Sequence, residues 1–330
     1  MTHLSRNTSI SAPGTAAMFA VALAAAALST ALAAVAAVPA GAHAQTLGQR
    51  IDTTFAVDRN AWLDVNFVSG TIVVTGWTRP DARIVGRTEN GLFEGTFNRD
   101  RINLSVRTDR SSRNRNRSGP AYVEISVPVG TRVMASTVSG GIRIRGTNAE
   151  VQANATSGNI EVVDATDRIV VGTVSGDIRL QRVRGRTRIN STSGDLELDA
   201  LTGELEIRTV SSDMRIDRVV SSDVRIGTTS GDISYGGTID PKGTYEISTH
   251  SGDVRFEVPS ATGATLSLQT YSGDIESSFP MTLQPGENLR RQRGRRMEFT
   301  IGDGGARVSI TTFSGDITIA RGFARGPGEE

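Results

Sequence analysis

The chain has 330 residues, 36 Lys and Arg against 35 Asp and Glu, 36 glycines, three histidines and no cysteine. The lack of cysteine excludes a disulfide framework, a thiol nucleophile and thiolate metal sites. The balanced charge argues against a general nucleic-acid binder, which carries a large positive excess. Two of the three histidines, His3 and His43, precede residue 45, so we expect no multi-histidine metal site and no cofactor.

The first 44 residues have the layout of a secretory signal peptide. A polar segment with Arg6 precedes an almost unbroken run of alanine, valine and leucine at 16–38, and Ala42-His43-Ala44 forms a small-x-small cleavage site. A transmembrane anchor is the alternative, because the run is long enough to span a bilayer. The weak apolarity of alanine and the cleavage site favour removal near Ala44. The mature chain would then have no membrane span and lie in the periplasm, on the cell surface or outside the cell.

Residues 45–132 are predicted to form an N-terminal β region. Leu63, Val65 and Val68, then Ile72, Val74 and Trp77, describe a first coil around Ser69-Gly70. The pattern breaks from Arg79 to Thr131. Within this stretch, 101–109 and 121–129 alternate apolar and polar residues, which predicts an inserted strand pair. The loop between these two strands is arginine-rich and includes Arg113, Arg115 and Arg117.

A repeat organises residues 133–320. Ser-Gly-Asp and its variants recur at a constant spacing at Ser139, Ser157, Ser175, Ser193 and Ser211, and then at wider spacings at Ser230, Ser251, Ser272 and Ser314. We interpret the last and widest spacing as two coils. Apolar residues recur in sets of three with steps of +2 and +3, such as Ile178, Leu180 and Val183.

The +2 step puts two side chains on one face of a strand, and we expect the third residue, as Val174 or Val210, to be tucked inside a corner. No single half-repeat can bury its apolar face alone, whereas stacked coils can. The sequence therefore predicts an all-β fold, a parallel β-solenoid (β-helix) of 18–21-residue coils. Ile178 and Ile189 should be buried, and Arg179 and Arg188 exposed.

The turns of the repeat are expected at Ser-Gly-Asp, because glycine tolerates positive φ and Asp side chains bond nearby backbone. Glycine is missing at Ser211-Ser212-Asp213 and at Ser221-Ser222-Asp223, and one residue is inserted before the second of these, so we predict a local distortion there. A basic loop at 281–296 interrupts the array and carries a cluster of arginines, and a polar tail follows at 321–330. The arginines are Arg290, Arg291, Arg293, Arg295 and Arg296.

The Ser-Gly-Asp-Ile array, the signal peptide, and Thr300-Ile-Gly-Asp-Gly-Gly-Ala-Arg-Val308 before Thr312-Phe-Ser-Gly-Asp-Ile317 resemble the bacterial putative-adhesin family, a domain of unknown function with β-strand repeats. The resemblance covers Leu63 to Ala320. It implies an exported β-solenoid of the cell envelope and carries over no catalytic residue.

Two candidate binding surfaces emerge. One is a ladder of hydroxyls, the Thr and Ser on either side of the residue that precedes each Ser-Gly, represented by Thr173, Ser175, Thr209 and Ser211. We expect these hydroxyls to point outward, where they could hold glycan or ordered water. The other is the pair of arginine loops, which could bind an anionic polysaccharide. The plainer readings are strand and turn preference for the hydroxyls and a solvated loop for the arginines.

Two further features have structural explanations. The column of turn aspartates, one per coil, fits turn capping better than a calcium ladder, because the calcium-binding nonapeptide pattern is absent. His250 occupies the slot filled elsewhere by Val174 or Phe313, and we expect it to be inward and structural.

The leading functional hypothesis is a non-enzymatic, exported cell-envelope scaffold or binding surface with an adhesin role. Its partner would be an envelope glycan, an anionic polysaccharide or an envelope protein, and not nucleic acid. The alternatives are a polysaccharide-active β-helix enzyme, which would need clustered acids on long loops, and a periplasmic partner of an envelope-stress regulator.

Overall fold

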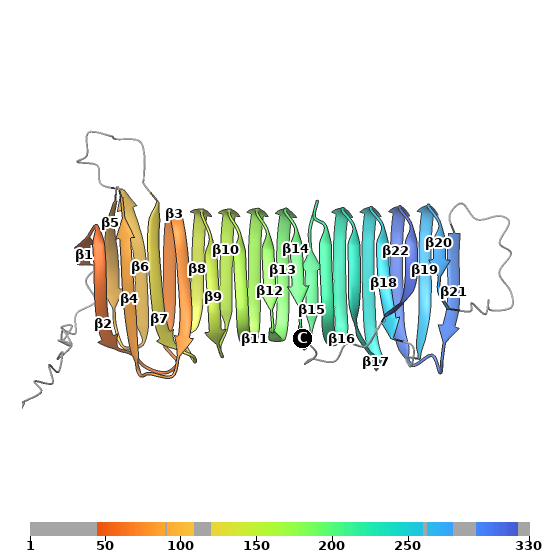
Figure 1. Cartoon of the computed structure of the whole chain (residues 1–330), viewed down its shortest axis with the longest axis horizontal. Helices are drawn as coiled ribbons and strands as arrows, with labels where there is room; N and C mark the ends of the chain where they lie inside the picture. Colours follow the sequence, from red (N-terminus) through yellow and green to blue (C-terminus); the bar gives the residue numbers. More distant parts are fainter. Residues whose placement is uncertain (1–44, 90, 109–119, 260–262, 280–294, 323–330) are drawn as a thin grey trace, which may run out of the picture. The chain divides into compact units, whose positions relative to one another are not determined.

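The computed structural model describes residues 45–89, 91–108, 120–259, 263–279 and 295–322, all within one compact unit, Val35–Glu330. These residues are all-β: 23 strands form one continuous sheet in which most neighbours are parallel (Figure 1). This confirms the all-β class and the dominance of parallel strands. Within the described ranges, no helix has the length and apolarity needed to cross a membrane.

The strands follow one another along the whole described chain. Their bounds are β1 Gln45–Gly48, β2 Arg50–Ala56, β3 Trp62–Trp77, β4 Asp81–Thr88, β5 Gly91–Phe97, β6 Arg101–Thr108, β7 Ala121–Pro128, β8 Arg132–Ser139, β9 Ile142–Thr147, β10 Val151–Ser157, β11 Ile160–Ser175, β12 Ile178–Gln181, β13 Arg184–Ser193, β14 Leu196–Asp199, β15 Leu205–Arg208, β16 Met214–Ser230, β17 Ile233–Ser251, β18 Val254–Pro259, β19 Ala264–Ser272, β20 Ile275–Ser277, β21 Arg295–Ile301, β22 Ala306–Ser314 and β23 Ile317–Gly322.

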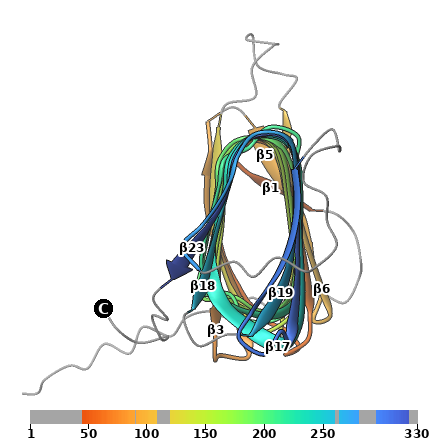
Figure 2. The same cartoon turned by 90° about the vertical axis from the view of Figure 1, so that its right-hand side faces the viewer.

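Like residues pair with like through the regular part of the sheet. Val133 lies beside Val151, and Val151 beside Ile169, so each partner stands one Ser-Gly-Asp repeat further along the chain. The chain passes from one wall of parallel strands to the other and back in each repeat, and Figure 2 shows the two walls end-on. We call the wall with β8, β10 and β13 wall A, and the wall with β9, β12 and β14 wall B. Apolar side chains fill the space between the walls, and Ile178 and Ile189 are buried as predicted.

The two edges that join the walls are built differently. At the Ser-Gly edge, the upper edge in Figure 1, the turn glycines have positive φ, for example 140° at Gly140 and 112° at Gly194. At the opposite edge, Asp164, Arg182 and Ala200 adopt φ of 54°, 51° and 55°. This left-handed residue turns the next side chain inward, so Val183 after Arg182 is buried.

The glycines of the Ser-Gly edge stack directly on one another. A Cβ at Gly140 would lie 1.8 Å from the carbonyl oxygen of Gly70, and a Cβ at Gly158 would lie 1.8 Å from that of Gly140. No L side chain fits such a contact. Where Ser212 replaces glycine, the residues from Thr209 to Asp213 leave the ladder except for an isolated bridge at Ser211, which is the distortion that the sequence predicts.

The N-terminal strands correct one prediction. β6 and β7 are strands as expected, but they do not pair with each other. β6 lies parallel to the first half of β3, and β7 to its second half, so they form a further repeat on opposite walls. Antiparallel strands then extend each wall beyond this repeat. β5 and β1 follow β6 on one wall, and β4 and β2 follow β7 on the other. Alternation of apolar and polar residues predicts that a segment is a strand, but it does not show whether two such strands pair as a hairpin or lie on separate walls.

The C-terminal strands correct a second prediction, that the repeats stack in sequence order. β22 lies between β17 and β19, and β23 lies between β18 and β20. The last strands therefore occupy an internal position, and in Figure 1 β22 stands on the inner side of β19, whereas β21 stands on its outer side. β21 begins at Arg295 and runs antiparallel to β19 as the outermost strand of wall A. The wide gap between Ser272 and Ser314 is therefore not two stacked coils, and β23 extends to Gly322, into the predicted tail.

Candidate binding edge

The predicted hydroxyl ladder is half buried. Thr173 and Thr209 point into the core, with 6% and 8% of their surface exposed, whereas Ser175 and Ser211 are exposed. The cause is the strand alternation, which continues without a break from Ile169 through Val171 to Thr173. The expectation of two outward files is therefore wrong for the threonines and right for the serines.

The residue between each threonine and serine points outward instead. We call this column the edge file. Six of its members are large apolar residues with 47–55% of their surface exposed: Val68, Val138, Val174, Val210, Phe313 and Tyr271. Its polar members are exposed too: Thr156, Thr192, Thr229 and His250. The prediction that this column, His250 included, is tucked inside is wrong.

The positive φ of the glycine explains why the edge file is outward. The turn occurs at the glycine itself, two residues after the file position, so the strand still alternates at the file. The opposite edge turns one residue before its apolar corner residue. A sequence signal for this outward column was available. Val133, Ala135 and Thr137 follow one another in +2 steps and already supply the inward residues of the strand, which leaves Val138 outward.

Three rings stack at the C-terminal end of the edge file. His250 lies on Phe313 with ring centroids 4.8 Å apart and planes 11° apart, and Phe313 lies on Tyr271 at 4.8 Å and 4°. The insertion of β22 between β17 and β19 creates this trio, because it places Phe313 between the other two residues. Sequence order alone would leave Phe313 beyond Tyr271.

The turn aspartates cap the next repeat. Asp177 Oδ1 accepts a hydrogen bond from the backbone N–H of Asp195 at 3.1 Å, and Asp253 Oδ1 accepts one from that of Asp316 at 2.8 Å. Asp213 and Asp232 do the same one repeat on. This is the capping role expected for Asx side chains. Across the described ranges, no group of three or more His, Asp or Glu could hold a metal ion.

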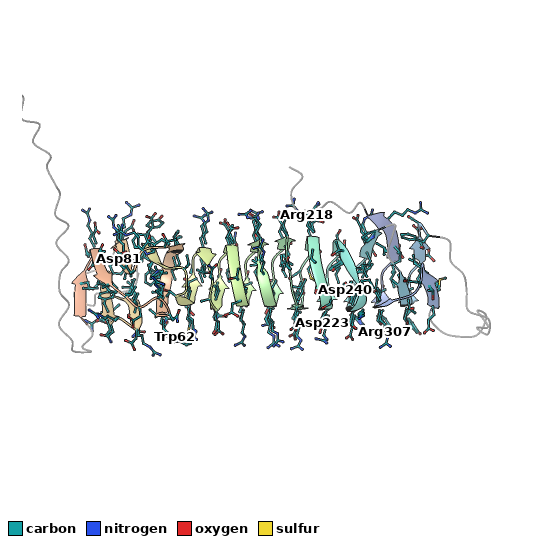
Figure 3. The ribbon with its side chains drawn as sticks, turned by 90° about the horizontal axis from the view of Figure 1, so that it is seen from below. Trp62, Asp81, Arg218, Asp223, Asp240 and Arg307 are labelled. Carbon is teal, nitrogen blue, oxygen red and sulfur yellow. The ribbon has the colours of Figure 1, made fainter. Side chains whose placement is uncertain are left out.

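Charged side chains project from both walls and pair across repeats. In Figure 3, Trp62, Asp223 and Arg307 project on one side and Arg218 on the other. Arg188 lies 2.7 Å from Glu206, and Arg145 lies 2.8 Å from Glu161. Exposed pairs of this kind contribute little each, but they cover the walls with charge. The edge file lies apart from these pairs, on the Ser-Gly edge.

Comparison with known proteins places this architecture. The Toastrack DUF4097 model matches residues 85–320, most of the chain and nearly the whole parallel array. The chain belongs to the Toastrack DUF4097 family. No curated protein matches it.

Two solved structures are similar to this Toastrack chain. One is a "putative cell adhesion protein" from Clostridium sporogenes ATCC 15579, with 10% identity, a TM-score of 0.21, and coverage of 83% of this chain and 100% of the other. The second is a "putative adhesin" from Bacteroides fragilis NCTC 9343, with 13% identity, a TM-score of 0.41, and coverage of 82% and 96%.

The arginine loops of this Toastrack chain fall mostly outside the described residues. Arg113, Arg115 and Arg117 lie there, as do Arg290, Arg291 and Arg293. The backbones of Arg295 and Arg296 belong to β21, opposite Thr270 and Gln269, and not to a loop as predicted. β6 ends at Thr108 and β7 begins at Ala121, at the position where other repeats carry Ser-Gly, so the described residues on either side of the first loop lie at the Ser-Gly edge.

Proposed function

We propose that this chain is an exported parallel β-solenoid of the cell envelope, built from 18–21-residue coils, and that its Ser-Gly edge is a non-enzymatic binding surface with an adhesin role. The constant pairing offset of one Ser-Gly-Asp repeat in the regular array supports the solenoid assignment. The edge file is the observation that carries the binding role.

Exposed apolar side chains are ordinary when scattered and informative when aligned. Of the eight large apolar side chains exposed on the described surface, six stand in the edge file. Neighbouring file positions are about 4.8 Å apart, the spacing of paired strands. An extended polymer or an envelope protein could contact many repeats at once along such a row.

The competing enzyme hypothesis requires acids that converge on a substrate. The acids of the Ser-Gly edge are instead distributed one per repeat, and they accept backbone hydrogen bonds there. Incubation of polysaccharides with the purified chain, followed by detection of new reducing or unsaturated ends, tests this alternative. A regulator partner would be found by affinity capture from envelope extracts.

We expect the triple variant V138S/V174S/V210S to bind isolated cell-envelope material much more weakly than the unaltered chain. Its melting temperature should stay close to that of the parent, because these side chains are half exposed and leave no cavity. Val220→Ser is the matched control, since Val220 is 42% exposed but lies outside the file. Equal binding by the triple variant and the parent would contradict a role for the file.

Salt separates this edge from the arginine loops. Binding through the uncharged file should change little between low and physiological salt, whereas exposed charges are screened beyond about 8–10 Å. A steep loss of binding with salt, abolished by changing Arg290, Arg291, Arg293, Arg295 and Arg296 to serine, would assign the surface to the basic segment instead.

Export is the other part of the proposal. We expect the mature protein to begin at Gln45, because Ala42-His43-Ala44 follows the apolar run. N-terminal sequencing of protein recovered from envelope and medium fractions measures this. An intact Met1 segment retained in the inner membrane would show an anchor in place of a cleaved signal.

A further inference from the structure

We propose that the ring trio His250, Phe313 and Tyr271 anchors a site for a neutral polysaccharide on the Ser-Gly edge. This inference rests on the binding role proposed above and names its ligand class. The trio is the only part of the described edge file where aromatic side chains stand on consecutive repeats. Aromatic residues are enriched among the side chains that contribute most to binding.

The orientation of the rings selects the ligand chemistry. Phe313 has a ring on each face, with interplanar angles of 11° and 4°, so its edge is the part left outward. An aromatic edge carries partial positive charge and the face partial negative charge. The outward edge of Phe313 therefore suits the oxygen atoms of a sugar, and it offers no face to an ammonium group.

The surroundings of the trio are polar. Two residues before each ring, on the outer face of wall A, the side chains are polar and exposed: Ser248, Thr311 and Gln269. On the turn side, the next residues, Ser251, Ser314 and Ser272, are exposed as well. Hydroxyl and amide groups both donate and accept hydrogen bonds, as the hydroxyls of a sugar require. A few polar groups around an apolar centre are typical of small-ligand and glycan recognition.

The acidic row of this edge disfavours anionic polymers. Asp253 and Asp316 are exposed, each three residues beyond a member of the trio, and Asp177, Asp195, Asp213 and Asp232 continue the row along the same edge. Like charges a few ångströms apart repel, so uronates, phosphates and sulfates are disfavoured there. The edge thus favours a neutral chain, and Thr229, Val210, Thr192 and Val174 offer it a continuous path from the trio.

The test uses the chain from Gln45 to Glu330 and measures binding by calorimetry. Chito- and cello-oligosaccharides serve as neutral probes, polygalacturonate as the anionic probe, and polylysine as the cationic one. We expect at least one neutral probe to bind and the double variant Y271S/F313S to bind it about tenfold more weakly or worse. Phe313→Tyr should retain binding, because it keeps the ring. Tyr122→Ser is the control, since Tyr122 is 37% exposed on β7, outside the edge file.

The outcomes separate this inference from the proposed function. If envelope material binds through the valines of the edge file but no neutral probe binds, or if Y271S/F313S leaves affinity unchanged, the neutral-glycan site is wrong and the binding surface stands. Trio-dependent binding of polylysine would overturn the inference in favour of a cationic protein partner. If envelope material does not bind at all, the binding surface fails as well. Far-ultraviolet circular dichroism melting of each variant shows that it is folded.

Discussion

Gly140→Ala should destabilise the protein by at least about 2 kcal/mol, the combined cost of a strained φ and an overpacked contact. Gly140 has a φ of 140°, and a Cβ there would lie 1.8 Å from the carbonyl oxygen of Gly70. That oxygen belongs to a stacked turn, so it cannot move without disturbing the neighbouring repeats. Urea unfolding followed by circular dichroism measures the loss.

The neighbouring Gly141→Ala is a control with the same chemical change. The nearest atom to its added Cβ is the carbonyl oxygen of Asn159 at 3.7 Å, an ordinary contact, and its φ is not positive. We expect its free energy of unfolding to stay near that of the parent or to rise slightly, because alanine restricts the unfolded chain. Equal losses for the two variants would show that the glycines do not stack as described.

Ile178→Asp should be more damaging, with a loss of about 3 to 5 kcal/mol, the range for an uncompensated buried charge. Ile178 is 1% exposed and lies between Ile160 and Leu196 on the adjacent repeats. The carboxylate would have no cation between the walls to pair with, because its neighbours on the adjacent strands, Ile160 and Leu196, are aliphatic. Thermal and urea unfolding both report the change.

Arg179→Gln provides the comparison at the next residue. Arg179 is exposed and donates a hydrogen bond from Nε to Glu197 Oε2 at 2.8 Å, and this bond raises the pKa of the guanidinium. Exposed ion pairs contribute about 0–1 kcal/mol, so the loss should stay below about 1 kcal/mol. Similar melting temperatures for the two variants would place Ile178 outside the core.

The repeat made the class of the fold predictable from sequence. Ser-Gly-Asp recurs with a constant offset, and a constant offset is what parallel pairing between equivalent strands requires. The burial of Ile178 and Ile189 followed from the +2 steps, which hold on both walls. The turn glycines were also predictable, because few other residues adopt positive φ at low cost.

The errors arose where two geometries share one spacing. The steps from Ile178 to Val183 and from Ile169 to Val174 are identical in sequence, yet Val183 is buried and Val174 is exposed. The difference is the left-handed conformation of Arg182, which has a φ of 51°. Arginine is not a residue type that favours positive φ, so the sequence does not indicate this turn. The edge file was therefore assigned to the interior, so sequence alone could not suggest it as a binding surface.

The internal position of β22 and β23 has a consequence for how the molecule folds. Among the described strands, β19 pairs with β21 and β22, and β20 pairs with β23, so β22 and β23 connect both to the rest of the sheet. This later segment must therefore enter a gap between elements made earlier. Growth by simple addition at one end, which repeat proteins allow, cannot complete this region while the ribosome still holds residues 306–322. We expect its closure to be the slow step of folding, because its contacts are long-range and must form together.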